Sequence, residues 1–184
     1  MRAFIAFDIN DDARAELARL QSTLKKSEAD AKWVSPENIH LTVKFLGEID
    51  EGQKKSIADS LDTITAAHKS VEIALSEIGA FPGIGRPKVL WAGIKGGVDE
   101  IIDIARSVDQ ECSKLGFQAE DRTFTPHLTI GRTRSSKNRE KLKQALSASS
   151  LKPIVSRVDA IHLYKSTLTP NGPVYEKVHE ARFG

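Results

Sequence analysis

Cysteine, methionine and aromatic residues are scarce in this chain of 184 residues. It contains one Cys and one Met, and Phe, Trp and Tyr together make up 6% of it. The lone Cys112 excludes an intrachain disulfide, and its position on an expected helix favours a packed thiol over a nucleophile. A disulfide-stapled fold is therefore excluded, and a reducing compartment is expected.

Long hydrophobic runs are also missing. The apolar stretch near the N-terminus is too short for the core of a signal peptide, and acidic residues follow it at once. No stretch approaches the ~20 apolar residues that a membrane-spanning helix needs. These absences predict a soluble, cytoplasmic protein without a membrane partner.

Charge of one sign is nearly balanced by the other. The chain has 27 Lys and Arg against 25 Asp and Glu, a net charge of +2. This excess is too small for a general nucleic-acid-binding surface. Six positive charges nevertheless lie close together, at Arg132, Arg134, Lys137, Arg139, Lys141 and Lys143. We interpret the expected helix at about 137–148 as a solvated face, and the pattern as a whole as favouring a local pocket for an anion.

What the chain does contain is a repeated tetrapeptide. His40-Leu41-Thr42-Val43 returns as His127-Leu128-Thr129-Ile130. For five His and ten Thr, chance gives only about 0.3 His-x-Thr triplets per chain. Apolar and polar residues alternate around both copies, which predicts strands, and residues i and i+2 of a strand share one face. Each copy therefore presents one imidazole and one hydroxyl side by side.

The hydrophobic pattern predicts four helices and seven or eight strands. The helices are expected after an Asn10 or Asp11 cap, around 57–64, at about 101–115 with a left-handed cap at Gly116, and at about 137–148. The strands are expected at 3–7, 33–34, 39–47, 71–78, 88–94, 127–130, about 154–165 and about 173–182. No linker interrupts them. We therefore expect an α+β fold with two related lobes, each contributing one His-x-Thr strand to a shared cleft.

Two histidines and two hydroxyls suit in-line displacement at phosphorus. With pKa values near 6.5, one imidazole can take a proton from the entering oxygen while the other protonates the leaving oxygen. The hydroxyls of Thr42 and Thr129 can bind the non-bridging oxygens, and Arg132 can offer positive charge. Simple strand alternation would turn Arg132 toward the core, so a bulge or strand end at Gly131 has to re-aim it.

Metal ligation is the competing interpretation of a histidine pair. A zinc site normally has three or four protein ligands, and no Asp, Glu or Cys accompanies either motif at ligand spacing. We therefore expect neither a metal nor another cofactor.

Four stretches resemble a known family: "RAFIAFDI", "WVSPENIHLTVKFLG", "FPGIGRPKVLWAGI" and "FTPHLTIGR". They resemble the two-histidine (2H) phosphoesterases, in particular the RNA 2′,3′-cyclic phosphodiesterases long called 2′-5′ RNA ligases. The resemblance covers essentially the whole chain. It implies one domain over residues 1–184, made of two interleaved lobes with pseudo-two-fold symmetry, antiparallel sheets facing a central cleft, and helices outside.

The resemblance also implies an activity and its residues. It implies metal-independent hydrolysis of RNA 2′,3′-cyclic phosphate ends to 2′-phosphates, with His40 as proton donor and His127 as proton acceptor. Substrate-binding candidates are Thr42, Thr129, Arg132 and Phe45. Trp33, Phe45 and Phe81 can each stack a nucleobase or pack in the core. RNA or a cyclic nucleotide is the expected partner, and a monomer is expected.

Two other functions stay open. Run backwards with an RNA 5′-hydroxyl as nucleophile, the ring-opening step is a 2′-5′ ligation; alternatively, the cleft could bind RNA ends without catalysis. The remaining histidines, His68, His162 and His179, have no Thr two residues on, and we expect them to be structural or on the surface.

Because no ligand set accompanies the motifs, phosphodiesterase activity is expected to survive exhaustive chelation. The measurement is turnover of a 2′,3′-cyclic phosphate before and after dialysis against EDTA, with metal content followed by mass spectrometry. Strict dependence of turnover on added Zn²⁺ or Mg²⁺ would contradict this expectation.

Overall fold

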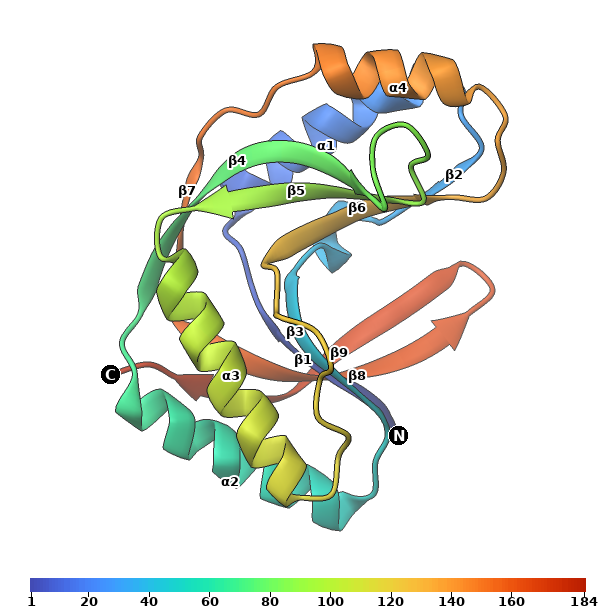
Figure 1. The fold of residues 1–184 in the computed structure, drawn as a ribbon. Coiled ribbons are helices and arrows are strands. Elements are labelled where there is room, and N and C mark those ends of the chain that lie inside the picture. The colour runs from blue at the N-terminus through green and yellow to red at the C-terminus, as the bar shows by residue number, and fades with distance from the viewer.

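The computed structural model describes residues 1–184 and contains nine strands, four α-helices and one short 3-10 helix (Figure 1). The strands are β1 (Arg2–Phe7), β2 (Ala31–Trp33), β3 (Leu41–Glu48), β4 (Val71–Phe81), β5 (Val89–Lys95), β6 (His127–Thr133), β7 (Val155–Val158), β8 (Ala160–Thr169) and β9 (Gly172–Arg182). The helices are α1 (Asp11–Lys25), η1 (Pro36–Asn38), α2 (Glu51–Ala67), α3 (Val98–Lys114) and α4 (Arg139–Ala148).

The strands form two antiparallel sheets. The four-stranded sheet has the order β3-β1-β8-β9, and the five-stranded sheet has the order β2-β6-β5-β4-β7. The first His-x-Thr motif lies at the start of β3 and the second on β6, so each sheet carries one motif. This confirms the α+β fold and the expectation that each lobe contributes one motif strand.

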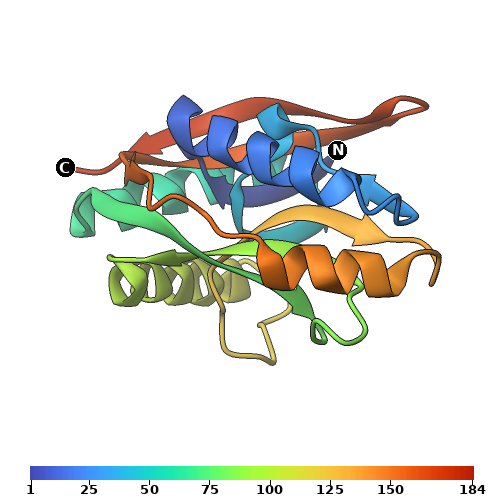
Figure 2. The same cartoon turned by 90° about the horizontal axis from the view of Figure 1, so that it is seen from above.

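The two lobes are interleaved along the chain. It runs from β1 in the four-stranded sheet to β2 in the other, returns for β3, forms β4 to β7 in the five-stranded sheet, and comes back for β8 and β9. Helices α1 and α4 lie side by side over the outer face of the five-stranded sheet (Figures 1 and 2). Helix α2 packs against β8 and β9 of the four-stranded sheet, and α3 packs against α2, β3 and β4, so α3 contacts both sheets.

One expected strand is two strands in the structure. The stretch expected at about 154–165 breaks at Asp159, where the chain leaves β7 in the five-stranded sheet and enters β8 in the four-stranded sheet. Val158, Ala160 and Ile161 are all buried, so the hydrophobic pattern continues across the break and does not reveal it. The total is therefore nine strands where seven or eight were expected.

The expected helix caps are confirmed. The Asn10 side chain accepts a hydrogen bond from the Ala13 amide at 2.9 Å, and Gly116 has a φ of 88° just after α3.

No helix is long and apolar enough to cross a membrane.

A single hydrophobic core lies beneath both motif strands. Ile39 and Leu41 flank His40 in the sequence and are fully buried, as are Leu128 and Ile130 on the second motif. All four belong to the same cluster of 35 buried residues. Since close-packed cores have low compressibility, this cluster holds the two motif strands in a fixed position relative to each other.

Trp91 on β5 pairs with Thr129 on β6 and needs a glycine beside it. A Cβ atom added to Gly79 on the neighbouring β4 would lie 2.1 Å from the Trp91 ring. Gly79→Ala should therefore displace Trp91 and lower the free energy of unfolding by about 1–3 kcal/mol. The control is Gly83→Ala, because a Cβ there meets nothing within 4 Å. Urea unfolding measures both variants, and equal stability would show that the ring can move without cost.

Candidate active site

The first histidine is held by aromatic rings. His40 immediately precedes β3, is 9% exposed, and makes no hydrogen bond through its ring to another protein group. Its ring is nearly parallel to Phe4, at 5.1 Å and 21°, and to Tyr164, at 5.2 Å and 14°. Tyr175 contacts it at a steep angle, with the ring centroids 5.2 Å apart. Three aromatic side chains thus fix its orientation.

The surroundings of His40 favour its neutral form. Burial lowers its pKa from 6.5 to about 4, while the charge of Asp8 opposes this shift and the charges of Arg14 and His162 add to it. The free protein therefore holds His40 unprotonated at neutral pH.

The second histidine is held by a hydrogen bond. The Nδ1 atom of His127 lies 2.7 Å from the backbone oxygen of Thr125. A carbonyl oxygen only accepts, so the network assigns the proton to Nδ1 and leaves Nε2 free for a ligand. The Phe81 ring meets His127 edge to face at 5.1 Å and 86°.

Each motif strand contains an extra residue three positions after its histidine. The pairing of β3 with β1 passes from Thr42 to Lys44 and omits Val43. The pairing of β6 with β5 passes from Thr129 to Gly131 and omits Ile130. Such bulges place two consecutive residues on the same side of the sheet.

The bulges turn two further side chains to the face that carries the motif threonines. Phe45 and Arg132, each five positions after its histidine, join Thr42 and Thr129 in lining one cavity. A bulge thus re-aims Arg132, and its extra residue is Ile130, one position before the expected Gly131. It also makes Phe45 the positional counterpart of Arg132 in the other lobe.

Gln21 of α1 stabilises the bulge on β6. Its side-chain amide donates to the backbone oxygens of Ile130, at 2.8 Å, and Val34, at 2.6 Å. The Val34 amide also donates to the Ile130 oxygen, at 3.0 Å. The role of Gln21 was not predicted from the sequence, although a polar side chain next to the apolar stripe of a helix can indicate such a contact.

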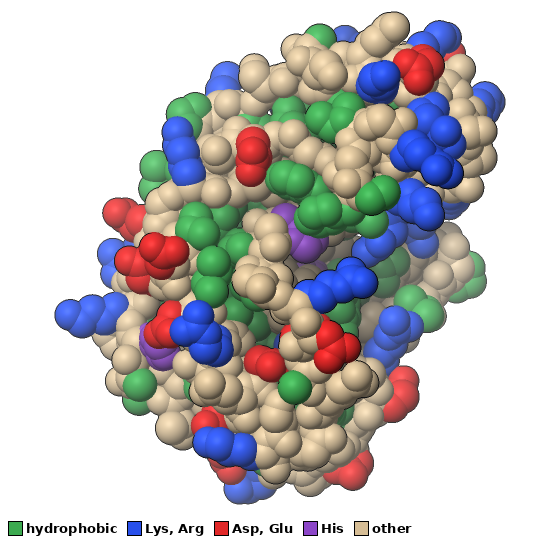
Figure 3. Space-filling view, viewed as in Figure 1, with side chains coloured by type: hydrophobic (Ala, Val, Ile, Leu, Met, Phe, Trp, Pro, Cys, Tyr) green, Lys and Arg blue, Asp and Glu red, His purple; other side chains and the backbone are tan.

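Both lobes line a cavity of about 920 Å³. Five of the six predicted site residues line it: Thr42, Phe45, His127, Thr129 and Arg132. His40 is not among the lining residues and lies in the aromatic cluster beside the cavity. Figure 3 shows the hollow between the lobes, with a histidine visible in it and Lys and Arg side chains around it.

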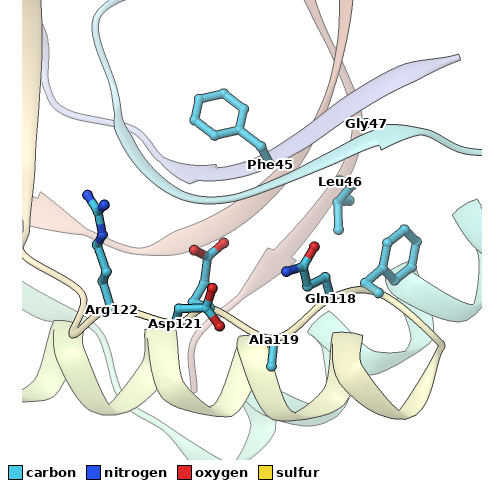
Figure 4. Close-up of a pocket in the computed structure, with 9 residues that line it drawn as sticks. Phe45, Leu46, Gly47, Gln118, Ala119, Asp121 and Arg122 are labelled. Carbon is cyan, nitrogen blue, oxygen red and sulfur yellow. The ribbon is translucent and has the colours of Figure 1, made fainter.

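A smaller groove of about 550 Å³ adjoins this cavity and shares Phe45, Glu120 and Arg122 with it. Its walls are residues 45–47 of β3 and residues 117–122 of the loop after α3 (Figure 4). The buried Lys44 fixes the loop, because its Nζ atom donates to Asp109 at 2.6 Å and to the Gln118 oxygen at 2.8 Å.

The aromatic candidates divide by position. Phe45 is 69% exposed at the cavity, and Phe81 lines the cavity against His127. Trp33 does not line it. The Trp33 ring packs against the core and would lie 3.0 Å from a Cβ at Gly131. Only the first two therefore lie where a base could reach them.

The remaining histidines and the cysteine are structural or on the surface, as expected. His68 caps the end of α2, and His179 lies 2.8 Å from Asp62. Cys112 is buried, which raises the pKa of its thiol to about 11. His162 is buried between carboxylates near His40, a position that its sequence neighbours did not indicate.

No group of three or more His, Cys, Asp and Glu is arranged to hold a metal ion.

Comparison with known proteins identifies relatives over the whole chain. The family model described as "LigT like Phosphoesterase" matches residues 7–91 and 94–175, and each stretch contains one His-x-Thr motif. An RNA 2′,3′-cyclic phosphodiesterase of Methanocaldococcus jannaschii is 39% identical over 183 residues, which are 98% of this chain and 99% of the relative. The enzyme of that name from Methanothermobacter thermautotrophicus is 36% identical over 176 residues, 95% of each chain.

Solved structures share the fold. A Thermus thermophilus protein superposes with a TM-score of 0.84 at 24% identity, covering 100% of this chain and 98% of that one. E. coli LigT complexed with 3′-AMP gives a TM-score of 0.78 at 21% identity, covering 99% and 97%.

The burial of His40 generates a pH prediction. In the free protein its ring should titrate near pH 4, whereas an unfolded histidine titrates near 6.5. The unfolded chain therefore binds more protons between these values, and the free energy of unfolding should fall as the pH drops from 6.5 to 4. NMR titration of the histidine ring protons measures this pKa, with the His40 line assigned by its loss in His40→Ala. A His40 pKa at or above 6.5 would contradict the prediction.

Proposed function

The chain belongs to the LigT-like phosphoesterase family of the two-histidine superfamily, and we propose that it is an RNA 2′,3′-cyclic phosphodiesterase producing 2′-phosphate ends. One observation carries the proposal. Strands from two different sheets, each bulged after its motif, bring Thr42, His127, Thr129 and Arg132 to one cavity, with His40 beside it. The names of the relatives support the choice of substrate.

In this mechanism His127 is the proton acceptor. Its Nε2 atom takes a proton from water, and the oxygen of the resulting hydroxide attacks phosphorus on the side opposite the 3′ oxygen. The bond from phosphorus to the 3′ oxygen breaks, and His40 donates a proton to that oxygen. The hydroxyls of Thr42 and Thr129 donate hydrogen bonds to the non-bridging oxygens as charge develops there.

The low pKa of His40 has a consequence for its role as proton donor. An imidazolium with a pKa near 4 is a stronger acid than an ordinary imidazolium, so it gives up its proton more readily once it carries one. The phosphate anion of the bound substrate favours the charged form and supplies the conditions for protonation. Protonation of His40 is thereby coupled to substrate binding.

Arg132 and Phe45 complete the substrate site from opposite lobes. Arg132 adds positive charge near the phosphate, and the exposed ring of Phe45 provides a surface on which a nucleobase can stack. Phe81 is engaged with His127, so it orients that ring.

We further propose that residues 1–184 act as one domain in a monomer, without a cofactor. Each lobe carries only one His-x-Thr pair, so neither lobe alone contains the acid and the base. The balanced charge and the single cysteine support a cytoplasmic location.

The ligase and the binding-only hypotheses make different predictions for the same site. Ligation uses the same residues with an RNA 5′-hydroxyl as nucleophile, and bulk water favours hydrolysis over it. An RNA-end binder needs no proton transfer, so Asn or Gln would serve in place of the histidines. The presence of two imidazoles in place of two amides therefore favours catalysis.

The test is turnover of an RNA oligomer with a 2′,3′-cyclic phosphate, beside a 2′-5′-linked oligomer, with the product identified by ³¹P NMR. His40→Ala and His127→Ala should each lower kcat by about 10² or more, while His179→Ala, a matched surface control, should not. Thr42→Ala and Thr129→Ala should each cost about 1–3 kcal/mol of transition-state stabilisation. A 3′-phosphate product, or near-normal kcat after loss of either motif histidine, would overturn the proposal.

A further inference from the structure

The two motif histidines are supported in unequal ways. His127 is oriented by a hydrogen bond to the backbone oxygen of Thr125, whereas the His40 ring contacts aromatic rings and makes no hydrogen bond. The position of the His40 ring therefore depends on these neighbouring rings and on its own backbone.

Arg14 of α1 holds the backbone that leads into His40. One guanidinium nitrogen donates to three carbonyl oxygens of the preceding turn, those of Pro36 at 3.1 Å, Glu37 at 3.1 Å and Ile39 at 2.6 Å. The other terminal nitrogen lies 3.4 Å from the Asp8 carboxylate.

Asp8 in turn holds the ring on which His40 stacks. Its carboxylate accepts a hydrogen bond from the Tyr164 hydroxyl at 2.5 Å, and Lys177 contacts its other oxygen at 2.5 Å. Burial works against ionisation of Asp8, but the hydrogen bonds from Lys177 and Tyr164, together with the charges of His162 and Lys177, lower its pKa. Asp8 is thus a charged acceptor at neutral pH, which strengthens the bond to Tyr164.

We propose that Arg14, Asp8 and Tyr164 form a clamp that positions His40 for proton transfer. The clamp fixes the backbone before His40 through Arg14 and the face of its ring through Tyr164, and Asp8 joins the two. None of the three lines the substrate cavity, so they are positioning residues. The proposal rests on the proposed function, since it concerns how one of the catalytic histidines is held.

The clamp predicts a loss in kcat that depends on His40. Tyr164→Phe keeps the stacked ring and removes its bond to Asp8, and Arg14→Met frees the turn. Each should lower kcat about 10- to 100-fold with little change in KM. In a His40→Ala background, the same substitutions should cause no further loss of kcat, because they act by positioning an imidazole that this variant lacks.

Arg19→Met is the matched control. Arg19 lies on the same helix and also contacts a carboxylate and a carbonyl, those of Glu16 and Ser150, but does not contact the turn before His40. Its substitution should leave kcat near the wild-type value. If Arg14→Met does not fold, Tyr164→Phe and Asp8→Asn carry the test.

A readout that needs no turnover separates the clamp from the enzymatic function. Tyr164→Phe should shift the NMR line of the His40 ring proton, which lies against two aromatic faces, and leave the His127 line in place. If the wild type hydrolyses no cyclic phosphate, the function fails while this readout still tests the clamp. The clamp is overturned if the His40 line does not move, or if Tyr164→Phe costs as much activity in the His40→Ala background as in the wild type.

Discussion

In-line displacement at phosphorus places the entering and leaving oxygens on opposite sides of the substrate, so a proton acceptor and a proton donor must face each other across it. One strand cannot meet this requirement, because its side chains approach the phosphate from one side. The chain meets it with two sheets, each carrying one His-x-Thr motif, and one hydrophobic core beneath both. The two-lobed fold is in this sense the form that the chemistry requires.

The two half-sites share a β-bulge and differ in the contacts that hold the imidazole. In each, a bulge after the motif brings a fifth residue, Phe45 or Arg132, to the cavity face. His127 has a backbone acceptor for its Nδ1 atom, whereas His40 lies among aromatic rings and its burial disfavours the charged form. A pair that is symmetric in sequence is therefore held by different contacts in the two lobes.

The sequence predicted the features that local pattern controls. The repeated motif, the alternation around it and the required bulge near Gly131 follow from neighbouring residues, and they led to the cavity-lining side chains. The break at Asp159 was missed, because burial continues while the strand changes sheet. The bond between Tyr164 and Asp8 joins residues 156 positions apart, and Gln21 reaches Ile130 across 109 positions, so neither contact has a local pattern to reveal it.

We propose that the two histidines have separate roles, with His40 protonating the leaving 3′ oxygen. The most direct test replaces that oxygen with sulfur, because a thiolate leaves with little need of a proton. The measurement is the rate of ring opening of the 3′-thio substrate by His40→Ala and by His127→Ala. The sulfur substrate should restore the activity of His40→Ala far more than that of His127→Ala. Preferential rescue of His127→Ala would contradict this assignment and exchange the two roles.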